Sequence, residues 1–141
     1  MTLRHVVQVE ASRGVPMAKS VLIVDDVEII RRALCELFTS EGDFEVCGEA
    51  ENGREAIEKA QELQPDLIVL DLSMPVMNGI EAASALRRLM PAVPLIIFSE
   101  YSDVFSEEEA RSAGVSALVS KSEHVSVLLE KARALLYPMA A

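Results

Sequence analysis

Five short, mostly apolar runs alternate with segments of helical periodicity, and this alternation constrains the fold of the chain more than any other feature. The runs are Val21–Val24, Phe44–Cys47, Asp66–Leu70, Leu95–Phe98 and Val115–Val119. Continuous apolar runs of this length are typical of strands that are buried on both faces. Strands that alternate with helices across short loops predict an α/β fold, a doubly wound parallel sheet with right-handed crossovers and helices on both faces.

Capping residues mark the ends of several expected helices. Asn52 stands where its side chain would cap the helix after the second run. Ser106 and Glu109 have the spacing of a capping box, and Gly114 stands where a residue with positive φ would end the same helix. The last helix is expected from about Glu123 to Leu136.

The first 18 residues differ in character from the rest of the chain. Arg13–Pro16 reads as a linker, because Gly and Pro interrupt regular structure. We therefore expect residues 1–18 to form a flexible N-terminal extension. Residues 19–141 are expected to form one domain, since a chain of 141 residues corresponds to a single domain of ordinary size.

The chain is strongly acidic, with a formal net charge of −10. A surface this negative repels phosphate backbones and anionic lipids, so we expect no direct binding to nucleic acid or membranes, although solubility alone explains the charge equally well. No apolar run approaches the roughly 20 residues of a membrane span, and the N-terminus lacks the features of a signal peptide. Cys35 and Cys47 form no C-x-x-C pair. These features predict a cytoplasmic protein with reduced thiols.

Five polar residues come just after predicted strands. Asp25 and Asp26 follow the first run, Asp71 follows the third, Ser99 follows the fourth, and Lys121 lies just past the fifth. The carboxyl ends of parallel strands meet at one edge of a sheet, which is where function gathers in such folds. We therefore expect these side chains to converge on one small site, although they are far apart in the sequence.

The residue types at this edge predict phosphoryl chemistry. Three clustered carboxylates repel one another, and a hard divalent cation with oxygen ligands removes that conflict. Mg²⁺ fits best, because it takes one or two carboxylates, keeps waters and accepts a phosphate oxygen. Lys121 provides a point charge for a phosphoryl oxygen, and the Ser99 hydroxyl provides a donor. Asp71 is then the expected nucleophile, since carboxylates form acyl phosphates.

Each of these residues has an ordinary explanation when it is taken alone. An aspartate at a strand end is commonly a turn or helix-cap residue, and adjacent Asp25 and Asp26 fit a capping pair as well as a metal site. A lysine near a helix start, such as Lys121, is usually solvated. The coincidence of all five residues at strand ends favours a functional site.

Two segments, Val21–Asp26 and Asp66–Gly79, are similar to the signature segments of response-regulator receiver domains. Ser99 and Lys121 stand where that family has its hydroxyl and its lysine. The resemblance covers about residues 19–137, and the combination of both segments is highly specific. It implies a flavodoxin-like (βα)5 fold whose five-stranded parallel sheet has the strand order 2-1-3-4-5.

The resemblance also implies a function in two-component signalling. Asp71 would accept a phosphoryl group from a histidine kinase, a phosphotransfer protein or a small donor such as acetyl phosphate. The domain would catalyse only its own phosphorylation and dephosphorylation. Mg²⁺ would be bound by Asp26, Asp71 and the backbone carbonyl of Ser73, with Asp25 acting mostly through water. Phosphorylation would pull the Ser99 hydroxyl inward and remodel a partner-binding face formed by the fourth helix, the fifth strand and the fifth helix.

Three positions depart from the pattern of the family, and Tyr101 lies two positions past Ser99. Glu100 stands where Ala or Gly is usual beside the phosphate, and Leu118 stands where a switch Tyr or Phe is common. Ser122 replaces the Pro that usually follows the lysine. Tyr101 is expected either to cover the pocket or to be a surface aromatic. We expect Glu100, Tyr101 and Leu118 to modulate access to the site and its switching.

The sequence leaves several functions open. A stand-alone receiver would act through an unknown output partner or as a homodimer through the switching face. A receiver fragment of a DNA-binding transcription regulator would continue beyond Ala141. A Mg²⁺-dependent phosphatase with an Asp nucleophile normally carries a second Asp two positions later, where this chain has Ser73. A flavin site is disfavoured by Asp25 and Asp26, because a flavin phosphate needs hydroxyl and backbone donors in that loop.

Overall fold

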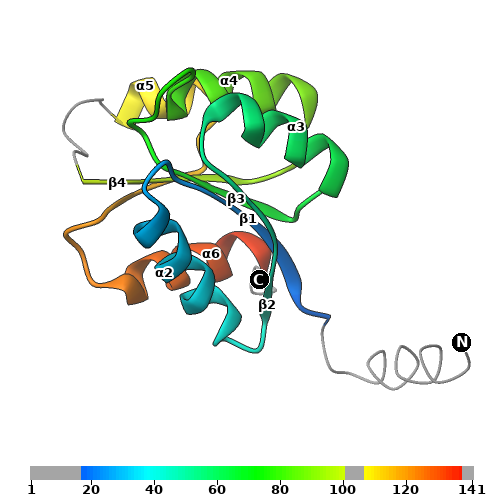
Figure 1. The fold of residues 1–141 in the computed structure, drawn as a ribbon, viewed down its shortest axis with the longest axis vertical. Helices are drawn as coiled ribbons and strands as arrows, with labels where there is room; N and C mark the ends of the chain where they lie inside the picture. The colour runs from blue at the N-terminus through cyan, green and yellow to red at the C-terminus, as the bar shows by residue number, and fades with distance from the viewer. Residues whose placement is uncertain (1–16, 101–106, 138–141) are drawn as a thin grey trace, which may run out of the picture.

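Strands and helices alternate along residues 17–100 and 107–137, which are the part of the chain described by the computed structural model. The elements, numbered as in Figure 1, are β1 (Lys19–Val24), α2 (Glu28–Thr39), β2 (Phe44–Ala50), α3 (Gly53–Leu63), β3 (Leu67–Leu70), α4 (Gly79–Leu89), β4 (Leu95–Ser99), α5 (Glu107–Ser112), β5 (Ala117–Ser120) and α6 (Val125–Leu136). The five strands form one parallel sheet of order β2-β1-β3-β4-β5. The predicted α/β class and strand order are confirmed.

Helices cover both faces of the sheet, with α3, α4 and α5 on one face and α2 and α6 on the other (Figure 1). Along β1, Leu22 and Val24 join the core on the first face, while Val21 and Ile23 join the core on the second. All four side chains are at most 1% exposed. Burial on both faces explains why this strand is continuously apolar rather than alternating.

The two cores are filled in different ways. The buried positions of α3 and α4 are largely alanines, so these helices pack close to the sheet. On the other face, Phe38 and Leu128 are fully buried, and the Phe38 ring meets Phe44 edge-on at 5.1 Å between centroids. Short side chains on one face and long ones on the other hold both helix layers against the same sheet.

Three element boundaries differ from the predictions. β2 continues beyond Cys47 to Ala50, because Gly48 and Glu49 pair with β1 after a register shift. An edge strand of this kind carries polar residues that hide its length in the sequence. β5 begins at Ala117 rather than at residue 115, and α6 begins at Val125, where the His124 side chain accepts a hydrogen bond from the Ser126 backbone.

Two predicted caps are confirmed and one lies outside the described residues. The Asn52 side chain accepts a hydrogen bond from the Glu55 backbone at 2.9 Å. Gly114 has a φ of +92°, as expected for a residue that ends a helix. Ser106, the predicted partner of Glu109 in a capping box, lies outside the described residues. Residues 1–16 of the expected N-terminal extension also lie outside them. None of the helices within residues 17–100 and 107–137 is long and apolar enough to cross a membrane.

Candidate functional site

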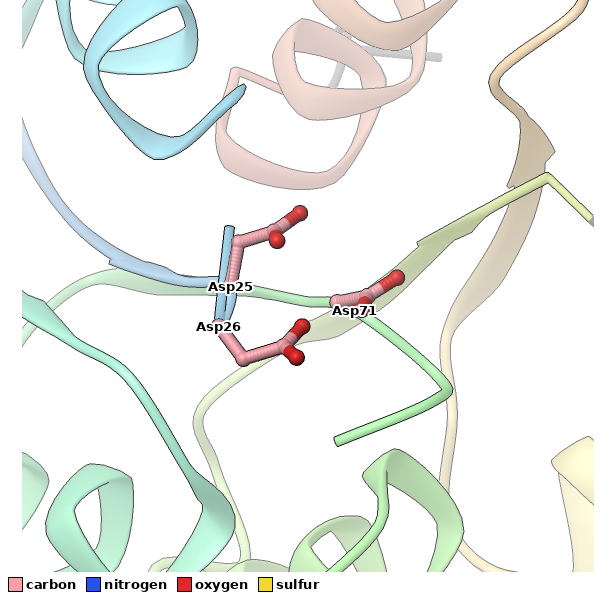
Figure 2. A group of neighbouring side chains, drawn as sticks. All are labelled: Asp25, Asp26 and Asp71. Carbon is pink, nitrogen blue, oxygen red and sulfur yellow. The ribbon is translucent and has the colours of Figure 1, made fainter. Parts of the chain in front are cut away.

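Three aspartates meet at the carboxyl edge of the sheet. Asp25 follows β1 and is 1% exposed, Asp71 follows β3 and is 7% exposed, and Asp26 is exposed at the surface. One carboxylate oxygen from each of them lies within 4.8 Å of the others (Figure 2). The backbone fixes this arrangement, since Asp71 N donates to Val24 O at 2.9 Å and Asp25 N donates to Ala50 O at 3.0 Å. The predicted convergence of these carboxylates is confirmed.

Lys121 completes the cluster from the loop after β5. Its Nζ donates to Asp25 Oδ2 at 3.0 Å and to Asp71 Oδ1 at 3.1 Å, and its side chain is 13% exposed. Its backbone N–H donates to Ser99 O at 2.8 Å, which ties the end of β4 to the lysine. Lys121 is therefore held against two carboxylates rather than solvated, as it would be at an ordinary helix start.

A cavity of about 350 Å³ opens at this cluster. It is lined by Asp26, Val27, Ile30, Asp71, Ser73, Ser99, Glu100 and Lys121. Asp25 is buried and does not line the cavity, but it contacts Lys121, which does. The cavity combines carboxylate oxygens, two serines and an ammonium, which are groups that bind a divalent cation and a phosphoryl group.

The electrostatics of the cluster favour a bound cation. Burial raises the pKa of Asp71 to about 6, the Asp25 charge adds to the rise, and Lys121 offsets only part of it. The pKa of Lys121 is raised as well, because its bonds to Asp25 and Asp71 outweigh the effect of burial. A cation among these oxygens would stabilise the ionised carboxylates, so the residues present fit a hard divalent metal such as Mg²⁺.

Asp25 does not cap α2, whose N-cap residue is Val27 with no side-chain cap hydrogen bond, but Asp25 does shape the turn before that helix. Its Oδ1 accepts a hydrogen bond from Val27 N at 2.9 Å, which forms a turn before α2. Its backbone carbonyl accepts a bond from Arg31 Nη1 at 2.8 Å, and the same guanidinium pairs with Glu49 at 2.9 Å. Arg31 and Glu49 carry no local signal in the sequence, because their contact joins the first turn of α2 to the edge strand β2.

The loop between Asp71 and α4 is tightly built. Val76 has a φ of +70°, which is rare for a β-branched residue, and Met77 N donates to Pro75 O at 2.7 Å. A Cβ on Gly79 would lie 2.5 Å from the backbone oxygen of Asp71. Only a glycine therefore allows α4 to begin this close to the aspartate.

The residues predicted to modulate the site occupy different places. Ser99 is buried at 3% exposure and lines the cavity together with the exposed Glu100. Leu118 is half-buried on β5, packs against the core under α3, α4 and α5, and lies away from the cavity. Ser122 is exposed, and no peptide bond among the described residues is cis. Tyr101 lies outside the described residues.

Comparisons with known proteins agree with this geometry. Residues 21–133 match the model of the response regulator receiver domain. The chain is 40% identical over 114 residues to the chemotaxis protein CheY of Thermotoga maritima, an alignment that covers 81% of this chain and 94% of that protein. It is 38% identical over 123 residues to a protein-glutamate methylesterase/protein-glutamine glutaminase of a Nocardioides species, covering 84% of this chain and 34% of that protein.

Solved structures of response regulators share the fold of this chain. A two-component response regulator of the LuxR family from Aurantimonas sp. SI85-9A1 superposes with a TM-score of 0.79 at 30% identity, covering 84% of this chain and 85% of that chain. The chain thus spans nearly all of the chemotaxis protein but about a third of the methylesterase. With its sheet order and its cluster at the carboxyl edge, the chain belongs to the response-regulator receiver domain family of two-component signal transduction.

Proposed function

We propose that Asp71 accepts a phosphoryl group, so that this receiver domain carries a phosphorylation signal. The observation that supports this most directly is the position of Lys121, whose ammonium lies within 3.1 Å of both Asp25 and Asp71 at the wall of the cavity. A lysine held there can pair with a phosphoryl oxygen. Its hydrogen bond goes to Oδ1 of Asp71, and Oδ2 has no protein partner within the described part of the chain.

The proposed transfer is a displacement at phosphorus. A carboxylate oxygen of Asp71 forms the new bond, and the bond between phosphorus and the donor breaks. The electron pair leaves with the donor, on the imidazole nitrogen of a phosphohistidine or on the acetate oxygen of acetyl phosphate. Lys121 and the Ser99 hydroxyl, which both line the cavity, would pair with the phosphoryl oxygens.

Dephosphorylation of Asp71 follows from the chemical nature of the phosphorylated product. An aspartyl phosphate is an acyl phosphate, which water hydrolyses to the free carboxylate and inorganic phosphate. We propose that the domain catalyses only its own phosphorylation and dephosphorylation. A phosphatase acting on other substrates would need a general acid near Asp71, and the residue two positions later is Ser73, which cannot serve as one at neutral pH.

We propose Mg²⁺ as the cofactor, held by Asp26, Asp71 and the backbone carbonyl of Ser73, with Asp25 acting mostly through water. Oxygen ligands of this kind suit Mg²⁺, and the exposed Asp26 suits an ion that keeps several waters. When bound, Mg²⁺ would offset the negative charge on the oxygens of the transferring group. Asp25, buried and bonded to Lys121, would keep the lysine in place.

We propose that a histidine kinase or a phosphotransfer protein supplies the phosphoryl group in the cytoplasm, and that α5, β5 and α6 report it. On that face Leu118 lines a separate cavity of about 220 Å³ together with Arg111 and Lys131. The output would be an unknown partner or a second copy of the domain. If the chain is part of a DNA-binding regulator, the output would be an attached domain, as the similarity to a LuxR-family regulator allows.

Intact-mass spectrometry tests the proposed function. After treatment with acetyl phosphate and Mg²⁺, we expect the protein to gain the mass of one phosphoryl group, and we expect no gain when EDTA removes the metal. A protein that gains no phosphoryl group in Mg²⁺ contradicts the proposal. Continuous turnover of a generic ester such as p-nitrophenyl phosphate would support the phosphatase alternative instead.

A further inference from the structure

Glu100 adds a third carboxylate to the lining of the cavity, beside Asp26 and Asp71. It directly follows β4, it is exposed, and it lines the cavity together with Asp71 and Lys121. The backbone just before Glu100 is hydrogen-bonded to the segment that carries Lys121. Lys121 N donates to Ser99 O at 2.8 Å, and Ser99 is in register with Ser120 of β5. Glu100 is therefore carried by backbone that is fixed beside the lysine.

The charges around the cavity do not balance. Within the described part of the chain, the cavity has one cation, Lys121, and its ammonium already lies close to Asp25 and Asp71. A bound divalent cation together with Lys121 would match the charges of Asp25, Asp26 and Asp71. Glu100 then contributes a negative charge that no described residue lining the cavity offsets.

We propose that the Glu100 carboxylate selects against phosphodonors of high negative charge. This inference rests on the proposed phosphorylation of Asp71. A donor must bring its phosphoryl group into the cavity that Glu100 lines, so the carboxylate repels an incoming dianion more strongly than a monoanion. The effect reserves Asp71 for donors that bring less negative charge, and protects it from small dianionic metabolites.

Two small donors separate charge from other effects. Acetyl phosphate is a dianion at neutral pH, whereas phosphoramidate is a monoanion overall because its nitrogen is protonated. Both transfer the same group, as Asp71 bonds to phosphorus while acetate leaves with the electron pair of the P–O bond, or ammonia leaves with that of the P–N bond. Comparing each variant with the parent for each donor cancels the difference between the leaving groups.

The test is the rate of phosphorylation of Glu100→Gln, which removes the charge and keeps the size. Rates are measured at Mg²⁺ concentrations that saturate each protein, as determined by titration calorimetry with the metal alone. We expect the rate with acetyl phosphate to rise roughly threefold to tenfold, and the rate with phosphoramidate to rise by a smaller factor. Because salt screens exposed charges, the gain with acetyl phosphate should shrink at about 1 M salt.

Glu51→Gln is the matched control. Glu51 is exposed and directly follows β2, at the same edge of the sheet, but it does not line the cavity. This variant loses the same charge as Glu100→Gln, so it measures the effect of net charge alone. We expect it to change neither rate by more than about twofold, since its charge lies outside the cavity and is screened by solvent and salt.

The outcomes separate the inference from the function on which it rests. Equal gains with both donors, no gain with either, or a gain in Glu100→Ala without one in Glu100→Gln would overturn charge selection. The last result would show that Glu100 obstructs the cavity by its size. If neither donor phosphorylates the parent or any variant, the proposed function fails, and the inference fails with it.

Discussion

The Lys121 ammonium lies 3.1 Å from Oδ1 of Asp71, and this contact joins the end of β3 to the loop after β5. The two side chains are nearly enclosed, at 13% and 8% exposure. The contact does not fully compensate for burial, because the pKa of Asp71 still rises to about 6 with burial and the Asp25 charge as its causes. A carboxylate in this condition is stabilised by a further cation, which is what the proposed chemistry requires.

The raised pKa of Asp71 predicts that its ionisation destabilises the fold. The folded state holds the Asp71 proton more tightly than the unfolded state, where the pKa is near 3.8. The contribution of Asp71 to the free energy of unfolding therefore falls as the pH rises from about 4 to about 6, by at most about 3 kcal/mol. Asp71→Asn should be more stable than the parent at pH 7, by about 1–3 kcal/mol. Urea unfolding at a series of pH values measures this.

The pH dependence of the stability difference between Asp71→Asn and the parent identifies its cause. The advantage of Asp71→Asn should disappear near pH 4, where the parent carboxyl group is protonated. Glu62→Gln is a suitable control, because Glu62 is an exposed residue of α3 whose carboxylate makes no hydrogen bond or ion pair within the described part of the chain. An advantage of Asp71→Asn that is the same at pH 4 and pH 7 would contradict the raised pKa. Mg²⁺ at pH 7 should stabilise the parent more than Asp71→Asn.

Gly79→Ala tests the close approach of α4 to the site. The new Cβ would lie 2.5 Å from Asp71 O and 2.9 Å from Leu72 Cα, and neither backbone atom can move alone. We expect a loss of about 1–3 kcal/mol in the free energy of unfolding and weaker Mg²⁺ binding, because Asp71 is displaced. Gly42→Ala is the control, since nothing lies within 4 Å of its added Cβ. Chemical unfolding and titration calorimetry measure the two effects, and unchanged stability in Gly79→Ala would contradict the packing.

Leu118→Tyr tests how phosphorylation is reported. Leu118 lies away from the cavity at Asp71, and it lacks the hydroxyl and ring of the usual switch aromatic. We expect NMR shifts upon phosphorylation to be small in β5 and α6 of the parent and larger in Leu118→Tyr. Leu118→Met, which keeps an apolar side chain of similar size, serves as the control. Equal shifts in the parent and in Leu118→Tyr would mean that Leu118 does not weaken the switch.

Much of the site could be predicted because its residues stand at strand ends. The continuous apolar runs located the strands, and a parallel sheet necessarily brings Asp25, Asp71 and Lys121 to one edge. The order of the strands came from the resemblance to a known family, since the apolar runs alone do not specify which strands are neighbours. The final position of Asp26, exposed at the cavity rather than buried, also needed the structure.

Other features depend on contacts that have no local sequence signal. Arg31 bonds to the Asp25 carbonyl and to Glu49, which is 18 residues away on the edge strand. The length of β2 was hidden because Gly48 and Glu49 pair with β1 without an apolar pattern. The left-handed φ of Val76 could not be predicted either, because β-branched residues rarely adopt it.

The site of phosphorylation is the most direct test of the central claim. The parent and Asp71→Asn are treated with acetyl phosphate and Mg²⁺, the acyl phosphate is reduced with borohydride, and the modified peptide is identified by mass spectrometry. We expect the parent to be modified at residue 71, and Asp71→Asn to take up no phosphoryl group. Undiminished phosphorylation of Asp71→Asn, or modification of the parent at another residue, would contradict the account.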